Sequence, residues 1–539
     1  MADTDSVSPV LAIEDLTLAL PRRADRAFAV QNLSLAIAAG ETLCVVGESG
    51  SGKSLTAYAV MGLLPRGVRA VSGSIRLAGT ELLGRDEASL CAVRGRDVGM
   101  VFQEPMTSLN PVMRVGDQIA ETFKAHRAFG PAERARRTLA LLDEVHLPDP
   151  PRLARAYPHE LSGGQRQRVM IAMALALEPR LLIADEPTTA LDVTTQAQVL
   201  KLIDELRAKH GMAVLFITHD FGVVAEIADR VVVLREGLAV EQGPVEAVLK
   251  RPEHPYTKKL LAAVPSLTPP APKSYASASP SLRVEGLAKT FGGRSLFGGG
   301  RKVQAVDDVG FAIRRGETLG LVGESGSGKS TVGRCVLRLL DPDRGAVHVG
   351  EIAITGLSQA ALRRHRRRVQ MVFQDPYSSL NPRRTVGRII AEGPIAQGAD
   401  EGAALATARR LLDLVGLPGQ AVDRYPHEFS GGQRQRIGIA RALAVEPEVL
   451  VADEPVSALD VSVQAQILEL IRDLQDRLGI AILFITHDLR VAAQVCDRIA
   501  VMRKGRIVET QDTAGLFASP RHPYTQQLLA AVPGAGRLL

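Results

Sequence analysis

The chain has 539 residues, of which 46% are hydrophobic and 23% charged, and its formal net charge is +6. This length exceeds what one hydrophobic core supports and predicts several domains, while the mild basic excess lacks the concentration that favours nucleic-acid binding. No run approaches the roughly 18–20 apolar residues that a membrane-spanning helix needs. Four cysteines stand singly, which fits a reducing compartment and disfavours a disulfide framework: Cys44, Cys91, Cys335 and Cys496.

The chain opens with residues 1–10, which have neither the basic flank nor the apolar core of a signal peptide, so none is expected. Alternating apolar residues at 11–20 predict a strand, and a short apolar strand, a glycine-rich loop and a helix follow it. A helix-rich stretch leads to SGGQ at 162–165, after which helices and short apolar strands alternate. This alternation indicates parallel α/β architecture.

The second half of the chain repeats the first in the same order. GETLCVVGESGSGKS at 40–54 recurs as GETLGLVGESGSGKS at 316–330, and LFITHD at 215–220 recurs at 483–488. Three further motifs recur between these two: 101–111 recurs at 372–382, 157–168 at 425–436 and 181–193 at 449–461. A period this long is not that of a solenoid, and it predicts two whole domains joined in tandem.

A stretch rich in proline, serine and alanine separates the two halves. This stretch, SLTPPAPKSYASASPS at 266–281, cannot bury a core and predicts an extended linker. We therefore expect a first domain over 1–265 and a second over 282–539. Each ends in a similar extension, EHPYTKKLLAAVP at 253–265 and RHPYTQQLLAAVP at 521–533.

Each half contains the pattern G-x-x-x-x-G-K-[ST] between an apolar strand and a helix, the context that a phosphate-binding loop requires. Its glycines let backbone N–H groups surround phosphate oxygens, and the helix N-terminus adds favourable partial charge. The lysine is expected to neutralise the β- and γ-phosphates of a nucleotide, and the final serine to bind Mg²⁺. The residues are Gly47, Glu48, Ser49, Gly50, Ser51, Gly52, Lys53 and Ser54, and Gly323, Glu324, Ser325, Gly326, Ser327, Gly328, Lys329 and Ser330.

A later apolar run in each half ends in two carboxylates. These are Asp185 and Glu186 in the first half, and Asp453 and Glu454 in the second. Neighbouring side chains on a strand point to opposite sides, so the two carboxylates can take different tasks. We expect the aspartates to hold Mg²⁺ and the glutamates to orient or deprotonate the attacking water.

The SGGQ segments combine a serine N-cap with two glycines at the start of an amphipathic helix, which makes either an ordinary capped helix or a second anion-binding site. They comprise Ser162, Gly163, Gly164 and Gln165, and Ser430, Gly431, Gly432 and Gln433. With both phosphate loops, this motif makes the chain resemble the ABC-type ATPases over nearly its whole length. The resemblance implies two tandem P-loop domains, each with a β-rich subdomain, a RecA-like parallel-sheet core and a helical subdomain. It also implies that ATP on Lys53 is shared with Ser430, and ATP on Lys329 with Ser162, in a head-to-tail pair.

The resemblance assigns further roles. Gln103 and Gln374 match the Q-loop glutamine, which contacts Mg²⁺ and the attacking water. Asp192 and Asp460 match the D-loop, and His219 and His487 match the switch histidine that senses the γ-phosphate. Phe291 occupies the adenine-stacking position of the second half, where the first half has Leu20. Since both halves keep the other positions, both sites are expected to hydrolyse ATP.

The linker and the two terminal extensions indicate which group of ABC ATPases the chain resembles. The linker is short, nearly uncharged and broken by Pro269, Pro270 and Pro272, which disfavours a soluble ABC ATPase acting on ribosomes. The HPYT extensions are similar to those of ATPase subunits from oligopeptide/dipeptide importers, and a fused chain of this length looks most like the microcin C/peptide type, with glutathione importers next. Some members hold an iron–sulfur cluster in the tail, but this chain has no cysteine in either extension.

The resemblance implies a peripheral ATPase on the cytoplasmic face of a bacterial inner membrane, energising peptide import. Two permease subunits and a periplasmic solute-binding protein are the implied partners, and no nucleic acid is expected. Glutathione, nickel or another small solute remains the alternative cargo.

Two features have no expected chemistry. In the extensions, Tyr256, Leu260 and Leu261, like Tyr524, Leu528 and Leu529, share one helix face and predict a packing element, with His254 and His522 as capping or hydrogen-bonding residues. The basic segment RRHRRRVQ at 363–370 is expected to be a solvated strand edge, with an anion or lipid-headgroup contact as the alternative.

Overall fold

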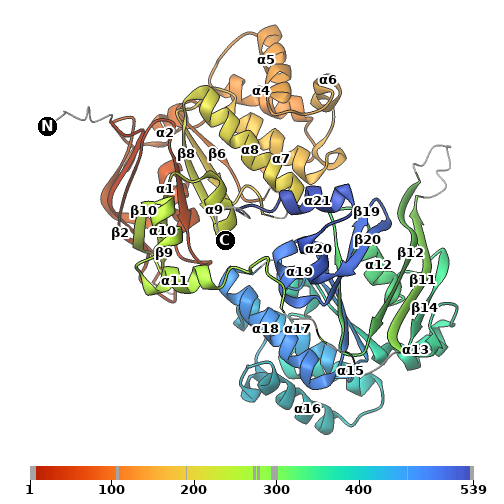
Figure 1. The fold of residues 1–539 in the computed structure, drawn as a ribbon. Coiled ribbons are helices and arrows are strands. Elements are labelled where there is room, and N and C mark those ends of the chain that lie inside the picture. The colour runs from red at the N-terminus through yellow and green to blue at the C-terminus, as the bar shows by residue number, and fades with distance from the viewer. Residues whose placement is uncertain are drawn as a thin grey trace. The chain divides into compact units, whose positions relative to one another are not determined.

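The computed structural model describes residues 8–534 apart from 23, 105–107, 190, 271–272, 274, 276–278, 293–301 and 458. The predictions for residues 1–7 of the N-terminus, for residues 105–107 of the VFQEPMTSLNP motif and for Pro272 lie outside the described residues. The chain forms two compact units, one of residues 1–262 with 533–539 and one of residues 263–532 (Figure 1). Each unit is described by itself.

The first unit contains two sheets. An antiparallel sheet has the order β2-β1-β4-β5, and a six-stranded sheet has the order β10-β9-β3-β8-β7-β6, in which all neighbours are parallel except β10 and β9. The strands are β1 (Leu11–Ala19), β2 (Phe28–Ile37), β3 (Thr42–Val46), β4 (Arg69–Leu77), β5 (Thr80–Glu81), β6 (Val98–Val101), β7 (Leu181–Asp185), β8 (Ala213–Thr218), β9 (Arg230–Arg235) and β10 (Leu238–Pro244).

The helices of the first unit include a separate helical group, α4 to α6, between β6 and the SGGQ helix α7 (Figure 1). The helices are α1 (Lys53–Met61), α2 (Glu87–Val93), α4 (Val115–Ala125), α5 (Pro131–Glu144), α6 (Pro150–Ala154), the 3-10 helix η1 (Pro158–Glu160), α7 (Gly163–Leu175), α8 (Val193–His210), α9 (Phe221–Ile227), α10 (Val245–Lys250) and α11 (Pro255–Ala262).

The second unit repeats this plan, with an antiparallel sheet β12-β11-β14-β15 and a six-stranded sheet β16-β17-β18-β13-β19-β20. Its strands are β11 (Pro280–Phe291), β12 (Val303–Arg314), β13 (Thr318–Val322), β14 (Arg344–Val349), β15 (Ile352–Ala353), β16 (Val369–Val372), β17 (Val449–Asp453), β18 (Ala481–Thr486), β19 (Arg498–Arg503) and β20 (Arg506–Asp512). Its helices are α12 (Lys329–Val336), α13 (Gln359–His365), η2 (Arg366–Arg368), α14 (Pro376–Ser379), α15 (Val386–Ala396), α16 (Glu401–Leu414), η3 (Gly419–Asp423), η4 (Pro426–Glu428), α17 (Gly431–Leu443), α18 (Val461–Leu478), α19 (Leu489–Val495), α20 (Thr513–Ala518) and α21 (Pro523–Ala530).

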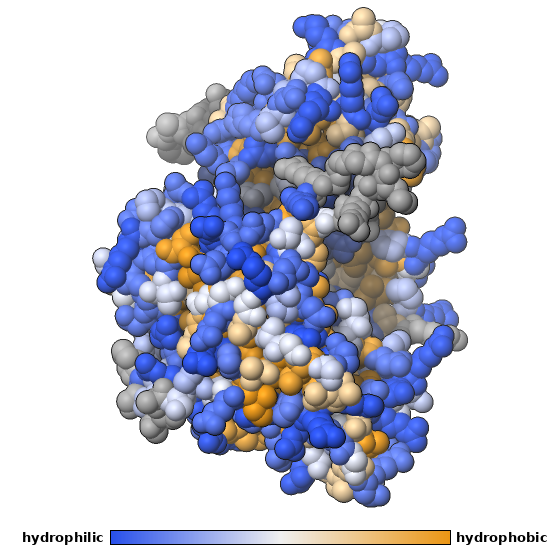
Figure 2. Space-filling view, turned by 90° about the vertical axis from the view of Figure 1, so that its right-hand side faces the viewer, coloured by the Kyte–Doolittle hydropathy of each residue, from blue (hydrophilic) through white to orange (hydrophobic). Residues whose placement is uncertain are grey.

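These sheets confirm the predicted α/β architecture and the tandem duplication. Strands β3, β7 and β8 are buried at every position, and their side chains share a hydrophobic core with the antiparallel sheet and α1. No helix in the described part of the chain is long and apolar enough to cross a membrane. The face drawn in Figure 2 is mostly hydrophilic, with smaller groups of hydrophobic residues between.

The segment between α11 and β11 forms no helix or strand among its described residues, as expected of a linker. It nevertheless binds the second unit: Gln494 donates to the Ser266 carbonyl at 2.9 Å, and the Lys273 ammonium lies 2.7 Å from the Asp476 carboxylate. These bonds attach the linker to α19 and α18. The domain boundaries drawn at 265/266 and 281/282 stay predictions of the sequence.

The expectation of a strand edge is wrong for the arginines of RRHRRRVQ, although its last two residues begin the edge strand β16. These arginines end α13 and form η2, and only the Val369–Val372 strand follows them. Ser358 caps α13 by accepting the Ala361 N–H at 3.3 Å, and basic residues in a last helical turn are favoured by the negative end of the helix dipole. Arg368 is fixed by Glu448, whose carboxylate lies 2.7 Å from its Nη2.

Substitution of Phe216 tests how much the buried strand β8 contributes to stability. Phe216 lies in β8 between β3 and β7 and is fully buried, so Phe216→Ala should lower the free energy of unfolding by about 3–5 kcal/mol. The exposed Val112 is the control, because Val112→Ala should change it by less than about 0.5 kcal/mol. Urea unfolding followed by circular dichroism measures both, and equal losses would contradict this account of the core.

Candidate functional site

Each glycine-rich loop begins on a glycine that no other residue can replace. Gly47 has φ 155°, and a Cβ there would lie 2.2 Å from the Leu234 carbonyl oxygen at the end of β9. Gly323 has φ 151°, with the Met502 carbonyl oxygen of β19 at the same 2.2 Å. Both loops run from a buried strand to a helix that starts at the motif lysine, which is the context predicted for a phosphate-binding loop.

The motif lysines are buried and turned back over their own loops. Lys53 Nζ donates to the carbonyls of Gly47 at 2.7 Å and Glu48 at 2.9 Å. Lys329 makes the same two bonds to the first two residues of the second loop, both at 2.8 Å. The loop carbonyls thus hold the positive charge at the place where the sequence predicts phosphate.

The motif serines meet the strand-end aspartates. Ser54 Oγ donates to Asp185 Oδ1 at 3.0 Å, and Ser330 Oγ donates to Asp453 Oδ1 at 3.0 Å. Burial raises the pKa of Asp185 to about 6 and also raises that of Asp453. Asp185 Oδ2 is buried and has no hydrogen-bond partner among the residues that the structure describes. A hydroxyl beside an unsatisfied carboxylate oxygen fits a hard divalent cation such as Mg²⁺.

Glu186 is the meeting point of three chain segments. Its carboxylate accepts hydrogen bonds from Gln103 Nε2 at 3.0 Å and Thr189 Oγ1 at 2.9 Å, and His219 Nδ1 lies 3.1 Å away. Burial opposes its ionisation, but the hydrogen bond and charge of His219, with help from Thr189 and Lys53, lower its pKa to about 2. The structure therefore brings Gln103 and His219 together at the ionised carboxylate of Glu186.

The second half repeats this arrangement with one difference. Gln374 Nε2 donates to Glu454 at 2.8 Å, and His487 Nδ1 lies 3.1 Å from the same carboxylate. The counterpart of Thr189 is Ser457, whose hydroxyl donates instead to the Glu454 backbone carbonyl at 3.2 Å. The roles of Thr189 and Ser457 were not predicted, although TT in one half against VS in the other is a visible difference in the sequence.

Both glutamates have a left-handed backbone, with φ 46° at Glu186 and at Glu454. A non-glycine residue in this region is uncommon and costs about 1–3 kcal/mol, and such residues concentrate at active sites. The conformation places each glutamate carboxylate beside the histidine of the next strand. Nothing in the sequence signals this strain.

The SGGQ segments begin helices α7 and α17 with capping boxes. Ser162 Oγ accepts the Gln165 N–H at 3.3 Å and the Gln165 side chain accepts the Ser162 N–H at 3.0 Å, as Ser430 and Gln433 do at 3.4 and 3.0 Å. Ser162 and Ser430 are exposed. The second glycine also serves packing, because a Cβ on Gly164 would lie 2.4 Å from Thr195.

The remaining predicted residues occupy distinct places. Asp192 caps α8 by accepting the Thr195 N–H at 2.9 Å, and Asp460 stands at the N-cap of α18. Phe291 ends β11 and is 43% exposed, whereas Leu20 packs against the core of the first unit. The first unit therefore offers no stacking side chain at the position of Leu20.

Arg26, in the connection between β1 and β2, was also missed. Its guanidinium donates to the carbonyl of Gly50, inside the first glycine-rich loop. No local pattern indicates this contact, because 24 residues separate the two positions.

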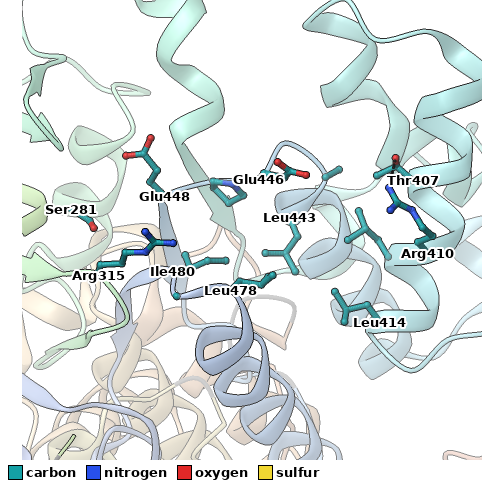
Figure 3. A pocket seen from close by; sticks show the side chains of 14 residues that line it. Ser281, Arg315, Thr407, Arg410, Leu414, Leu443, Glu446, Glu448, Leu478 and Ile480 are labelled. Atoms are coloured by element: carbon teal, nitrogen blue, oxygen red, sulfur yellow. Dashed lines mark hydrogen bonds between the residues drawn. The ribbon is translucent and has the colours of Figure 1, made fainter. Parts of the chain in front are cut away.

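A cavity of about 690 Å³ in the second unit lies apart from these residues (Figure 3). Leucine side chains of α16 and α17 line it together with Ile480, Arg315 and Arg410. None of the predicted nucleotide-site residues contributes to its wall, so it belongs to a different part of the second unit.

Comparison with known proteins agrees with this geometry. Residues 30–189 and 306–457 match the family model of the ABC transporter, and residues 240–294 and 508–537 match the C-terminal region of the oligopeptide/dipeptide transporter. The chain is 49% identical to the glutathione import ATP-binding protein GsiA of Salmonella paratyphi A, over 98% of this chain and 90% of that protein. It is 48% identical to GsiA of Escherichia coli O6:H1, over 99% and 91%.

The raised pKa of Asp185 predicts how the free energy of unfolding changes with pH. The pKa of Asp185 rises from 3.8 to about 6 on folding, so the folded protein disfavours the ionised carboxylate. Asp185 therefore destabilises the folded protein increasingly as the pH rises from 3.8 to about 6. In the absence of divalent cations, Asp185→Asn should therefore raise the free energy of unfolding near pH 8 by up to about 3 kcal/mol. Near pH 4 the same substitution should change it little. Urea titrations at both pH values, with the exposed Asp204→Asn as control, measure this. A loss of stability at pH 8 would contradict it.

Proposed function

Because this chain belongs to the ABC transporter family and carries the oligopeptide/dipeptide C-terminal region in both halves, we propose that it energises the import of glutathione or a closely similar peptide. The chain is an ABC ATPase, which hydrolyses ATP to drive transport of a peptide-like solute. The proposal that glutathione is the solute is supported by the similarity of this chain, over nearly its whole length and at 49% identity, to a glutathione import ATPase. The family match of the extensions keeps longer peptides as the second candidate.

In the proposed reaction, the first loop binds ATP phosphates through its backbone N–H groups, and Lys53 exchanges its loop carbonyls for phosphate oxygens. Ser54 and Asp185 would hold Mg²⁺, which neutralises charge on the β- and γ-phosphates. Glu186, ionised and left-handed, orients the attacking water. Ser330, Lys329, Asp453 and Glu454 take the same roles in the second half.

Gln103 and His219 hold the Glu186 carboxylate from two sides, so each is placed to respond when phosphate and water arrive. We assign the same part to Gln374 and His487. In each half the glutamine follows the edge strand of the six-stranded sheet, β6 or β16, and the histidine follows β8 or β18.

Each SGGQ segment is proposed to complete the ATP site of the other half, Ser430 with Lys53 and Ser162 with Lys329. Both serines are exposed at the positive end of a helix, which supports binding of a γ-phosphate from outside their own unit. Asp192 and Asp460 begin the helices that follow the catalytic strands and would lie at the same junction. Phe291 is exposed and is proposed to stack on adenine in the second half.

The proposed partners are two inner-membrane permease subunits and a periplasmic solute-binding protein, with this chain on the cytoplasmic face. The import function of the relatives supports this assignment. ATP binding closes the two halves, hydrolysis and phosphate release reopen them, and the Q-loop segments pass the motion to the permeases.

Glu186→Gln and Glu454→Gln test whether both halves hydrolyse ATP. Loss of a catalytic carboxylate lowers the rate of its site about 10²–10⁴-fold, so each variant should lose at least half of the total phosphate release, and to a similar degree. Glu205→Gln, the same change on the exposed face of α8, is the control. If one catalytic variant keeps the full rate while the other loses all of it, equal sites are ruled out.

Import experiments test the proposed solute. In cells that carry this chain with its neighbouring permeases and binding protein, uptake of radiolabelled glutathione should depend on an intact Lys53 and Lys329. A peptide competitor that suppresses uptake far better than glutathione would identify a peptide importer instead. If the chain co-sediments with ribosomes and brings no hydrophobic permease from detergent extracts, import itself is contradicted.

A further inference from the structure

The HPYT extensions are held against the β-hairpin that precedes them. In the first half, the Glu241 carboxylate of β10 accepts the N–H groups of Glu253 at 2.8 Å and His254 at 3.2 Å. His254 Nδ1 in turn accepts the N–H of Tyr256 at 3.2 Å, so the predicted capping role of the histidine is confirmed. These bonds fix the start of α11, the helix in which the Tyr256 side chain is buried.

The Tyr256 hydroxyl reaches the phosphate-binding loop. It accepts the backbone N–H of Glu48 at 3.4 Å and donates to the Glu48 carboxylate at 3.1 Å. The guanidinium of Arg235, at the end of β9, lies over the tyrosine ring at 5.1 Å. Burial raises the pKa of Tyr256 to about 12, so the hydroxyl keeps the proton that it donates.

The second half makes the same contacts with its own residues. Tyr524 accepts the backbone N–H of Glu324 at 3.2 Å, and Arg503 lies over its ring at 4.6 Å. His522 Nδ1 accepts the Tyr524 N–H at 3.1 Å, and Glu509 accepts the first two N–H groups of the extension at 2.7 and 3.0 Å. An arrangement kept in two halves whose sequences differ elsewhere points to a common task.

Glu48 connects the extension to the motif lysine. Its N–H and carboxylate bind Tyr256, while its carbonyl accepts the Lys53 ammonium. The other side of the loop is held by the β9–β10 turn, where Gly237 N–H donates to the Ser51 carbonyl at 3.0 Å. The tyrosine and this turn thus hold two different positions of the loop, Glu48 and Ser51.

We propose that Tyr256 and Tyr524 are positioning residues for ATP binding, which hold the second residue of each phosphate-binding loop and, through it, the motif lysine. A loop already held in place loses less conformational freedom when phosphate binds. The hydroxyls bind the second residue of each loop and not the glutamate proposed to orient water, so we expect them to affect nucleotide affinity. This inference rests on the ATPase activity and is independent of which solute is imported.

The test is the double variant Tyr256→Phe/Tyr524→Phe in the full chain. The change keeps both rings under their arginines and removes only the hydroxyls. Loss of the hydrogen bonds that each hydroxyl makes with its loop should raise the KM for ATP, and the Kd of a fluorescent ATP analogue, about 3- to 10-fold. The kcat at saturating ATP should stay within about 2-fold, because no group at the reaction centre has changed.

The matched control is His254→Ala/His522→Ala, which removes the helix caps of the same extensions and leaves the tyrosine hydroxyls. It should lower the thermal unfolding midpoint, as loss of a cap does, and raise the KM for ATP less than the tyrosine variant does, because the hydroxyls remain. An unchanged KM in the tyrosine variant would overturn the proposal. An equal rise in both double variants would overturn it too, because docking of the extension and not the hydroxyl would then set the affinity.

Discussion

The nucleotide site of each half depends on one close backbone contact. The first glycine of the phosphate-binding loop lies against the carbonyl at the end of the neighbouring strand, with space for a hydrogen and none for a methyl group. This contact turns the chain sharply after β3 or β13 and lets the next helix begin at the motif lysine. The serine that follows can then meet the aspartate two strands away in the sheet.

The position of the glutamate proposed to be catalytic follows from the same sheet. Parallel strands bring the ends of β6, β7 and β8 to one edge, which places Gln103, Glu186 and His219 within hydrogen-bonding distance although they are far apart in sequence. The left-handed backbone of Glu186 stores strain that the surrounding hydrogen bonds maintain. The hydrogen bond and charge of His219 lower the pKa of this carboxylate despite its burial.

The structure also changes the meaning of the terminal extensions. As sequence they are amphipathic segments without chemistry, and the packing predicted for them is present, since Tyr256 and Leu260 are buried. Their aromatic ring is held by an arginine and its hydroxyl by the phosphate-binding loop. A feature typical of one importer group therefore contacts machinery common to the whole family.

Sequence alone determined the duplication, the α/β class and the identity of nearly every residue at the two candidate sites. It could do so because each motif is local: a loop, a strand end or a helix start carries its chemistry within a few residues. Only the tertiary structure decided what depends on distant contacts. These are the left-handed glutamates, the bond from Thr189 to the Glu186 carboxylate, which Ser457 replaces with a bond to the Glu454 backbone carbonyl, and the arginine segment folded as a helix end. The packing of Leu20 against the core belongs with them. The bond between Tyr256 and Glu48 joins positions 208 residues apart, and no local pattern encodes such a contact.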